Sequence, residues 1–343
     1  MADFNFLDGS FDARSPSFDA QRTINLYVEG TESGTSRSRV ALIGTPGLAL
    51  WATMGSGGIR GMLRFNATVA IVVSGMNIYK VTTAGAATLL GTTTSATSTV
   101  SMASNGFIIM LVTGGTDGYF INPTTNVVTP ITDTDFTGGG RVDYLDGYFV
   151  WSVPNSQRFQ LSQLYGSAID ALDFASAEGA PDALISLITD HRELWLFGET
   201  STEVWYDAGG SDFPLQRIQG AFLEIGCMAR DSVAKLDNSV FWLATDDRGF
   251  GTIQRAAGYT PQRVSNHAVE AAIARYGSVS DAVGYTYQQE GHSFYVISVP
   301  GAGATWCLDV SNGRWHERPY RDPATGTLTR HRSNCQIDRK SVV

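Results

Sequence analysis

The sequence predicts an all-β fold, a β-propeller of about six four-stranded blades with one short inserted helix. The first observation is a polar turn followed by a strongly apolar run, which recurs six times along the chain. The second is the spacing of these turns, at positions 66, 105, 146, 191, 237 and 290, which are 39, 41, 45, 46 and 53 residues apart. The third is an aromatic or aliphatic residue near the centre of the third strand in each repeat. About four short strands in a repeat of this length are typical of propeller blades.

The first two repeats match strand by strand. The first predicts strands at 59–65, 69–73, 78–81 and 88–90, and the second at 99–103, 107–112, 118–122 and 127–131. The third strands are centred on Tyr79, Phe120, Phe159, Trp205, Ile253 and Trp306. Asn105-Gly106 and Asp146-Gly147 suit type I′ hairpins, since Asn, Asp and Gly tolerate positive φ.

The longest repeat contains an expected helix at 266–276. Its residues are good helix formers, and Val269, Ile273 and Tyr276 fall on one face at helical spacing. Ser265 or Asn266 supplies the N-cap, and Gly277 ends the helix. A second helical turn is predicted at 166–174, and the rest of the chain is predicted to be strand or loop.

Three segments are expected. Residues 1–50 form an N-terminal arm whose alternating stretch, Thr23 to Val28, predicts a strand. That strand is available to complete a blade begun at the other end of the chain, which would remove an open sheet edge. Residues 51–320 form the propeller, and residues 321–343 form a C-terminal segment.

The composition restricts the function. The formal net charge of −9 argues against a broad grip on nucleic acid, because phosphate contacts need clustered Lys or Arg. Three widely spaced cysteines, Cys227, Cys307 and Cys335, give no disulfide framework or zinc spacing and are expected to be free thiols. No signal peptide is predicted at the N-terminus. No apolar run approaches the roughly 20 residues of a membrane helix.

No residue is predicted to be catalytic, to bind a cofactor or to bind a metal. The carboxylate pairs Asp133–Asp135 and Asp246–Asp247 could serve hydrolysis of a glycoside. Both lie in polar turns, however, where Asp is favoured because it bonds its own backbone. The stretch 309–315 resembles the Asp-box hairpin of sialidases, which is a structural turn. The five histidines show no ligand spacing.

The N-terminal stretch 17–27, followed by Gly44-Thr45-Pro46-Gly47-Leu48, resembles the opening of the packaged-DNA stabilization proteins. These are tail accessory or hub proteins of short-tailed bacteriophages. The segments 146–150, 198–206, 315–318 and 320–326 are similar to the same family, so the resemblance covers about residues 15–335. Family members continue for more than a hundred further residues, so this chain is either a short member or a truncated form.

The resemblance implies a structural virion protein rather than an enzyme. Such hubs form a ring, a hexamer by family analogy, beneath the portal and its adaptor ring, and close the DNA exit after packaging. They also carry tail spike, fibre or needle proteins, and DNA passes through without specific binding. This implies assembly in the host cytoplasm and residence in the tail of the virion. Interface or blade-closing contacts are expected from the N-terminal residues Phe18, Arg22, Asn25, Leu26 and Tyr27.

Two other functions stay open on the sequence. One is a propeller glycoside hydrolase, which would turn over a glycoside. The other is a kelch-like scaffold that binds a protein partner, which would be a soluble monomer. A ring of copies would favour the hub instead. A propeller is a platform on which many functions are built, so the fold alone does not choose among the three.

Overall fold

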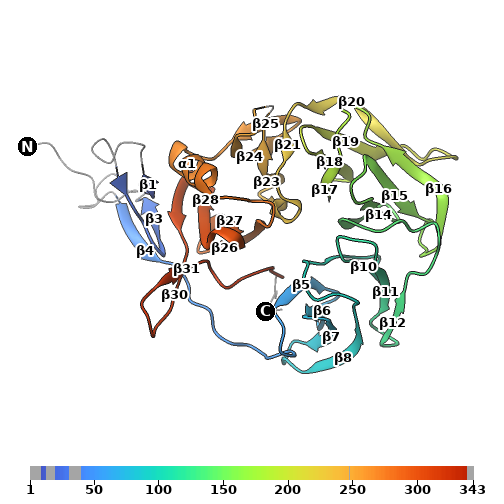
Figure 1. Cartoon of the computed structure of the whole chain (residues 1–343), viewed down its shortest axis with the longest axis horizontal. Coiled ribbons are helices and arrows are strands. Elements are labelled where there is room, and N and C mark those ends of the chain that lie inside the picture. The colour runs from blue at the N-terminus through green and yellow to red at the C-terminus, as the bar shows by residue number, and fades with distance from the viewer. Residues whose placement is uncertain (1–8, 13–19, 31–39, 247, 338–343) are drawn as a thin grey trace, which may run out of the picture.

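A computed structural model of the chain describes residues 9–12, 20–30, 40–246 and 248–337. It confirms the predicted all-β propeller of six blades arranged around one axis (Figure 1). Each blade is an antiparallel meander of strands that follow one another in the sequence. None of the helices that the structure describes is long and apolar enough to span a membrane.

Blades 1 to 3 each have four strands, which pair in sequence order. Blade 1 comprises β5 (Ile59–Arg64), β6 (Val69–Ser74), β7 (Asn77–Thr82) and β8 (Ala87–Thr92). Blade 2 comprises β9 (Ser101–Ser104), β10 (Ile109–Val112), β11 (Gly118–Asn122) and β12 (Val127–Pro130). Blade 3 comprises β13 (Val142–Leu145), β14 (Tyr148–Ser152), β15 (Arg158–Ser162) and β16 (Ile169–Ser176). The strands predicted for the first two repeats agree with these to within two residues at each end.

Blade 5 differs from the others because two short strands, β21 and β22, share its inner edge and both pair with β23. Blade 4 comprises β17 (Leu184–Asp190), β18 (Glu193–Gly198), β19 (Thr202–Asp207) and β20 (Leu215–Leu223). Blade 5 comprises β21 (Gly226–Cys227), β22 (Ala234–Leu236), β23 (Ser239–Thr245), β24 (Gly251–Ala257) and β25 (Thr260–Arg263). Blade 6 comprises β26 (Val283–Gln289), β27 (His292–Val299), β28 (Ala304–Asp309) and β29 (Arg314–Glu317).

The recurring turns adopt the predicted left-handed backbone in four of the six repeats. The turn residues Asp146, His191, Asp237 and Glu290 have φ values of 46°, 50°, 49° and 50°, and each is followed by a second residue with positive φ. The prediction is wrong for Asn105, because only Gly106 in that pair has a positive φ. The Asn105 side chain instead accepts hydrogen bonds from the backbone amides of Phe107 and Ile108, which makes a wider turn.

The predicted helix is confirmed as α1 (His267–Arg275), between blades 5 and 6. Asn266 is its N-cap, and its side chain accepts a hydrogen bond from the Val269 amide at 2.9 Å. The helical turn predicted at 166–174 is wrong. Strand β16 occupies most of it, because pairing with β15, for example Phe174 with Gln160, overrides the local helix propensity of this Ala- and Leu-containing stretch.

Apolar clusters fill the spaces between successive blades from blade 1 to blade 6. They are built from the recurring apolar runs, whose alternate residues face the preceding and the following blade. Ile71 and Val73 of β6, for example, pack against Ile109 and Leu111 of β10. Burial of this apolar surface is the main source of the fold's stability.

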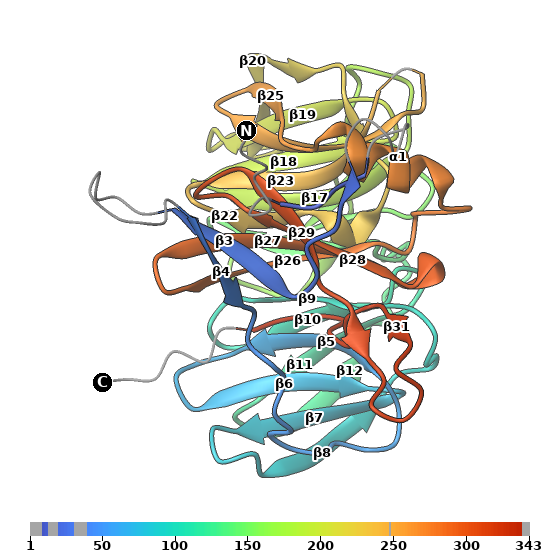
Figure 2. The same cartoon turned by 90° about the vertical axis from the view of Figure 1, so that its left-hand side faces the viewer.

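The N-terminal arm lies against blade 6 and does not take the place of one of its four strands. Strand β3 (Leu26–Gly30) pairs with β4 (Val40–Gly44), and this hairpin stands in front of blade 6 in Figure 2. An isolated parallel bridge joins Ile24 to Glu317 beside β29. The short pairs β1 (Phe11–Asp12) with β2 (Ala20–Gln21), and β30 (Tyr320–Arg321) with β31 (Leu328–Thr329), complete the described strands, and two 3-10 turns, η1 (Arg230–Ser232) and η2 (Pro300–Ala302), are also present.

Candidate functional site

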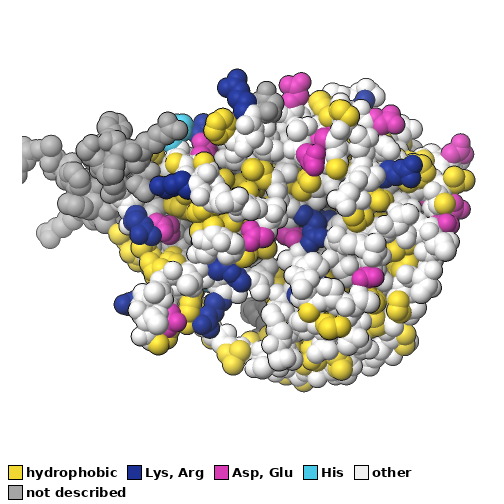
Figure 3. All heavy atoms as spheres, in the orientation of Figure 1, with side chains coloured by type: hydrophobic (Ala, Val, Ile, Leu, Met, Phe, Trp, Pro, Cys, Tyr) yellow, Lys and Arg dark blue, Asp and Glu magenta, His cyan; other side chains and the backbone are white. Residues whose placement is uncertain are grey.

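The main hollow of the molecule lies on the propeller axis. A cavity of about 880 Å³ opens there and is lined by segments of all six blades. One lining residue from each blade, in order, is Ile59, Thr99, Gly140, Ile185, Met228 and Val283. Figure 3 views this face, with Lys or Arg side chains lying beside Asp or Glu side chains around its centre. The axis is therefore the place where parts of the chain far apart in sequence meet.

Arg141, just before the first strand of blade 3, joins three blades by hydrogen bonds near the propeller axis. We call such an arginine an axial brace. Its guanidinium donates hydrogen bonds to the Arg230 carbonyl at 2.8 Å, the Val233 carbonyl at 3.1 Å and Ser186 Oγ at 3.2 Å. Burial lowers the pKa of Arg141, and the nearby Asp231 carboxylate opposes that shift. A guanidinium presents several donors in a fixed plane, so one side chain can tie blade 3 to blades 4 and 5.

Arg230 makes a second brace from the 3-10 turn η1 (Arg230–Ser232) of blade 5. It donates to the Gly140 carbonyl at 3.1 Å and to Thr99, and pairs with Asp231 at 3.0 Å. Burial opposes ionisation of Asp231, but the charge and hydrogen bonds of Arg230 outweigh it and hold the pKa of the carboxyl below its usual value. Blades 2, 3 and 5 are thereby joined across the centre.

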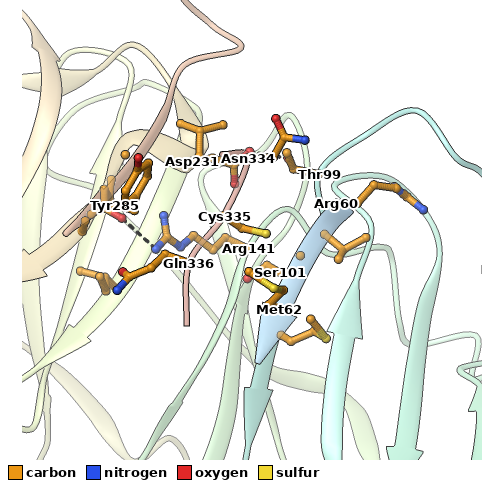
Figure 4. Close-up of a pocket in the computed structure, with 18 of the residues that line it drawn as sticks. Arg60, Met62, Thr99, Ser101, Arg141, Asp231, Tyr285, Asn334, Cys335 and Gln336 are labelled. Atoms are coloured by element: carbon orange, nitrogen blue, oxygen red, sulfur yellow. Dashed lines mark hydrogen bonds between the residues drawn. The ribbon is translucent and has the colours of Figure 1, made fainter. Parts of the chain in front are cut away.

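A second cavity of about 300 Å³ adjoins these braces on the same axis. Figure 4 shows Cys335 and Gln336 of the C-terminal segment lying in it, between Tyr285 of blade 6 and Met62 of blade 1. Burial raises the pKa of the Cys335 thiol to about 12, so this thiol stays protonated at neutral pH. Arginine side chains and the C-terminal segment thus cross the centre of the propeller.

The arginine side chains on the axis make hydrogen bonds and ion pairs within the protein. Arg60, Arg230 and Arg330 line the larger cavity together with Asp231 and Asp281. Arg60 donates to the Gly75 carbonyl at 2.9 Å and to other oxygen atoms of blade 1 and of the following loop. Guanidiniums engaged in this way offer few free donors to the phosphates of a nucleic acid.

The predicted N-terminal residues come together on blade 6, except Phe18, which lies outside the described residues. Arg22 forms a two-point ion pair with Glu317, with Nε–Oε1 at 2.8 Å and Nη2–Oε2 at 2.6 Å. Asn25 has a φ of 54°, and its side chain donates to the Pro319 carbonyl at 3.1 Å. Both contacts attach the arm to the chain that leaves blade 6.

The other two predicted residues lie in β3. Leu26 pairs with Gly44 of β4 and is half-buried. Tyr27 is buried with its ring edge against Phe294, at a centroid separation of 5.3 Å, and its hydroxyl donates to Glu290 Oε2 at 3.2 Å. These contacts lie within one chain, and whether the motif also contacts a partner remains a prediction.

The carboxylates that suggested glycoside hydrolysis take part in turns. Asp133 Oδ1 accepts a hydrogen bond from the Asp135 amide at 3.0 Å. Asp246 Oδ1 accepts from the amides of Arg248 and Phe250, both at 3.0 Å, while Asp247 is outside the described residues. Asp309, in the hairpin that resembles an Asp-box, accepts from the Ser311 amide at 3.0 Å. The carboxylates of Asp133, Asp246 and Asp309 therefore have local structural roles. Asp135 Oδ2 instead accepts a hydrogen bond from the Ala171 amide of β16 at 3.2 Å.

The sequence reasoning missed the axial braces. Arg141 and Arg230 are isolated cations 89 positions apart, and neither lies in a motif that predicts a contact. The only feature of the nearby sequence that indicates close packing at this place is the run of three glycines before Arg141. An ideal Cβ on Gly140 would lie 2.7 Å from Ser152 Oγ, so this segment approaches its neighbours closely.

Comparison with known proteins identifies a matching protein family and several solved structures of similar fold. The family model described as "Bacteriophage P22 Gp10, beta-propeller" matches residues 2–319. No match was found among curated proteins. Similar solved structures include the designed protein Ika8, at 13% identity and TM-score 0.48, covering 85% of this chain and 82% of that one. U3-55K is similar at 10% identity and TM-score 0.49, covering 78% and 83%. With TM-scores below 0.5, neither likeness has any bearing on function.

Proposed function

Because the chain belongs to the family of bacteriophage P22 Gp10 β-propellers, we propose that it is a ring-forming hub of a short-tailed phage tail. The family supports a structural role as a component of the phage particle. In the proposal, the hub closes the channel of the portal and adaptor rings after packaging and carries spike, fibre or needle proteins below. It acts without a catalytic step and without a cofactor.

The braced axis is the structural observation that supports this proposal. A protein through which DNA leaves a capsid needs a passage, and Arg141, Arg230 and residues 334–336 cross the centre of the propeller. The passage must then run between several copies of the chain rather than through one. A ring of copies, a hexamer by family analogy, provides such a passage, and heterologous contacts that close on themselves form rings of this kind.

The N-terminal arm is the proposed ring or adaptor contact. It lies against blade 6, where β3 and β4 form a two-stranded sheet of their own. Arg22, Asn25 and Tyr27 fix this sheet to the propeller, and Leu26 belongs to the sheet itself, so residues beside them could be presented to a neighbour in a fixed position. Phe18 belongs to the same motif and is proposed to take part.

Negative-stain microscopy of the purified protein, alone and mixed with the portal and adaptor proteins of the same phage, tests the proposal. We expect closed rings with a central hole, seated on the adaptor end of the portal. A monomer that binds neither ring would favour the kelch-like scaffold. Turnover of a glycoside that is lost in Asp246→Asn would favour the hydrolase.

A further inference from the structure

The seam between blade 6 and blade 1 differs from the other five. Each of the other seams has an apolar cluster shared by the two blades that flank it. Among the described residues, no apolar cluster joins blade 6 directly to blade 1. Since apolar burial is the main force that holds neighbouring blades together, this seam lacks the interaction that closes the others.

The chain that precedes β5 covers the free faces of both blades at this seam. On blade 6, Phe294 and Val296 pack against Tyr27 and Ile43 of the β3–β4 hairpin. On blade 1, Val72 and Val81 pack against Met54, which comes shortly before β5. Each blade therefore buries its apolar face against the chain that precedes β5 instead of against the other blade, and the two stay separate.

Residues 330–337 bridge the two blades near the axis. On the blade 6 side, the His331 amide donates to Thr305 Oγ1 at 2.9 Å, and Ser333 Oγ donates to the Tyr285 hydroxyl at 2.7 Å. On the blade 1 side, Asn334 Nδ2 donates to the Ile59 carbonyl at 3.1 Å. The segment therefore contributes a line of hydrogen bonds where the other seams have an apolar core.

The bridge continues onto blade 1. Cys335 and Gln336 lie in the smaller axial cavity, with Tyr285 of blade 6 on one side and Met62 of blade 1 on the other, as drawn in Figure 4. Ile337 lines an apolar groove of about 540 Å³ that Leu50, Trp51 and Val69 also line. The segment is thus held at both ends, by hydrogen bonds on blade 6 and by one hydrogen bond and an apolar side chain on blade 1.

We propose that residues 330–337 are a latch, and that the propeller is a split ring which this latch holds shut. Displacing the latch opens the seam between blades 6 and 1 and leaves the five apolar seams closed. The reason is the different strength of the contacts, because a few hydrogen bonds contribute less to stability than the burial of an apolar cluster.

Hydrogen exchange on the full-length protein, followed by mass spectrometry, tests the latch. In Ser333→Ala/Asn334→Ala, the amides of β5 and β26 should exchange about tenfold faster or more, since two bridging hydrogen bonds are lost. The amides of β13 and β17, on the opposite side of the ring, should keep their protection. Point substitutions are used because removal of the whole segment could prevent folding.

Ser101→Ala is the matched control. Ser101 Oγ lies 3.1 Å from both the carbonyl oxygen and the amide nitrogen of Val142, so it bridges blades 2 and 3 as Ser333 bridges the segment to blade 6. That seam also has an apolar core that contains Phe149 and Trp151. The control should leave exchange in β9 and in the rest of β13 unchanged, apart from the Val142 amide, which loses its acceptor. Unchanged exchange in the latch variant, or equal loss of protection in all six blades, would overturn the proposal.

Discussion

Arg22 and Glu317 form a two-point ion pair that joins positions 295 residues apart in the sequence. The pair holds the N-terminal arm against the last strand of blade 6. It is partly open to water, because the Arg22 side chain is 58% exposed. Ion pairs of this kind contribute little to stability. Tyr27, five residues further along, is buried against Phe294 and is expected to contribute more.

The first prediction compares these two anchors of the arm. Tyr27→Ala should lower the free energy of unfolding by about 3 kcal/mol, as expected for removal of a buried aromatic ring. Arg22→Ala should lower it by less than about 1 kcal/mol. Urea unfolding followed by tryptophan fluorescence measures both. Equal losses in the two variants would mean that the ion pair, rather than apolar packing, anchors the arm.

The second prediction concerns the seam between blades 4 and 5. Trp195 is buried and lies against Phe197 and Tyr259. Trp195→Ala should therefore lower the free energy of unfolding by roughly 3–5 kcal/mol. Phe107 is the control, because it is 79% exposed at a turn. Phe107→Ala should change stability by no more than about 0.5 kcal/mol. A Trp195 variant as stable as the Phe107 variant would contradict the assignment of the recurring aromatics to the core.

The recurring turns and apolar runs made the six blades predictable, because each blade repeats the same local pattern. The helix was predictable for a similar reason, since Asn266, Val269 and Ile273 follow one another at intervals of about one helical turn. Strand β16 was missed because its pairing with β15, not its own composition, decides its conformation.

The axis and the seam could not be predicted from the sequence. The contacts of Arg141 and Arg230 join blades 3 and 5, and those of Asn334 join the two ends of the chain. Such pairs leave no periodic signal. Of the five predicted N-terminal residues, the four that the structure describes contact blade 6 or its hairpin, which the resemblance anticipated only as interface or closure contacts.

The third prediction is that stability falls as the pH falls below about 6.5. Burial and Arg318 lower the pKa of His316 to about 3, and burial, Arg318 and Arg330 lower the pKa of His331 to about 4. An unfolded histidine titrates near pH 6.5, so between these values the unfolded chain binds more protons than the folded one. The contribution of the two neutral imidazole rings to the free energy of unfolding is complete above about pH 6.5. It is lost as the pH falls toward 4, where His331 titrates, and then toward 3, where His316 titrates.

Urea unfolding at a series of pH values from 7.5 to 4, on the wild type and on His331→Gln, measures this effect. Carboxyl groups that titrate in the same pH range change the stability of both proteins equally. The difference between the two slopes of unfolding free energy against pH is therefore due to His331. The variant should lose less stability than the wild type on acidification. Parallel slopes would show that His331 takes up its proton equally well in the folded state.

The fourth prediction is weak binding to duplex DNA by the isolated protein. The chain has a net charge of −9, and the arginines on its axis donate to the protein's own carbonyls and carboxylate. Retention of DNA would then depend on physical closure together with partner proteins. A mobility-shift assay titrated with salt measures the affinity. Nanomolar binding with a steep salt dependence would reveal a basic surface that contacts phosphates.

The central claim is that the chain closes a phage particle after its DNA has been packaged. The most direct test is to count DNA-filled heads, by electron microscopy and by nuclease-protected DNA, in particles of its phage assembled with and without this protein. We predict that particles without it package DNA and then lose it, and that adding the purified protein before the DNA escapes prevents the loss. Heads that stay full without the protein would contradict the claim.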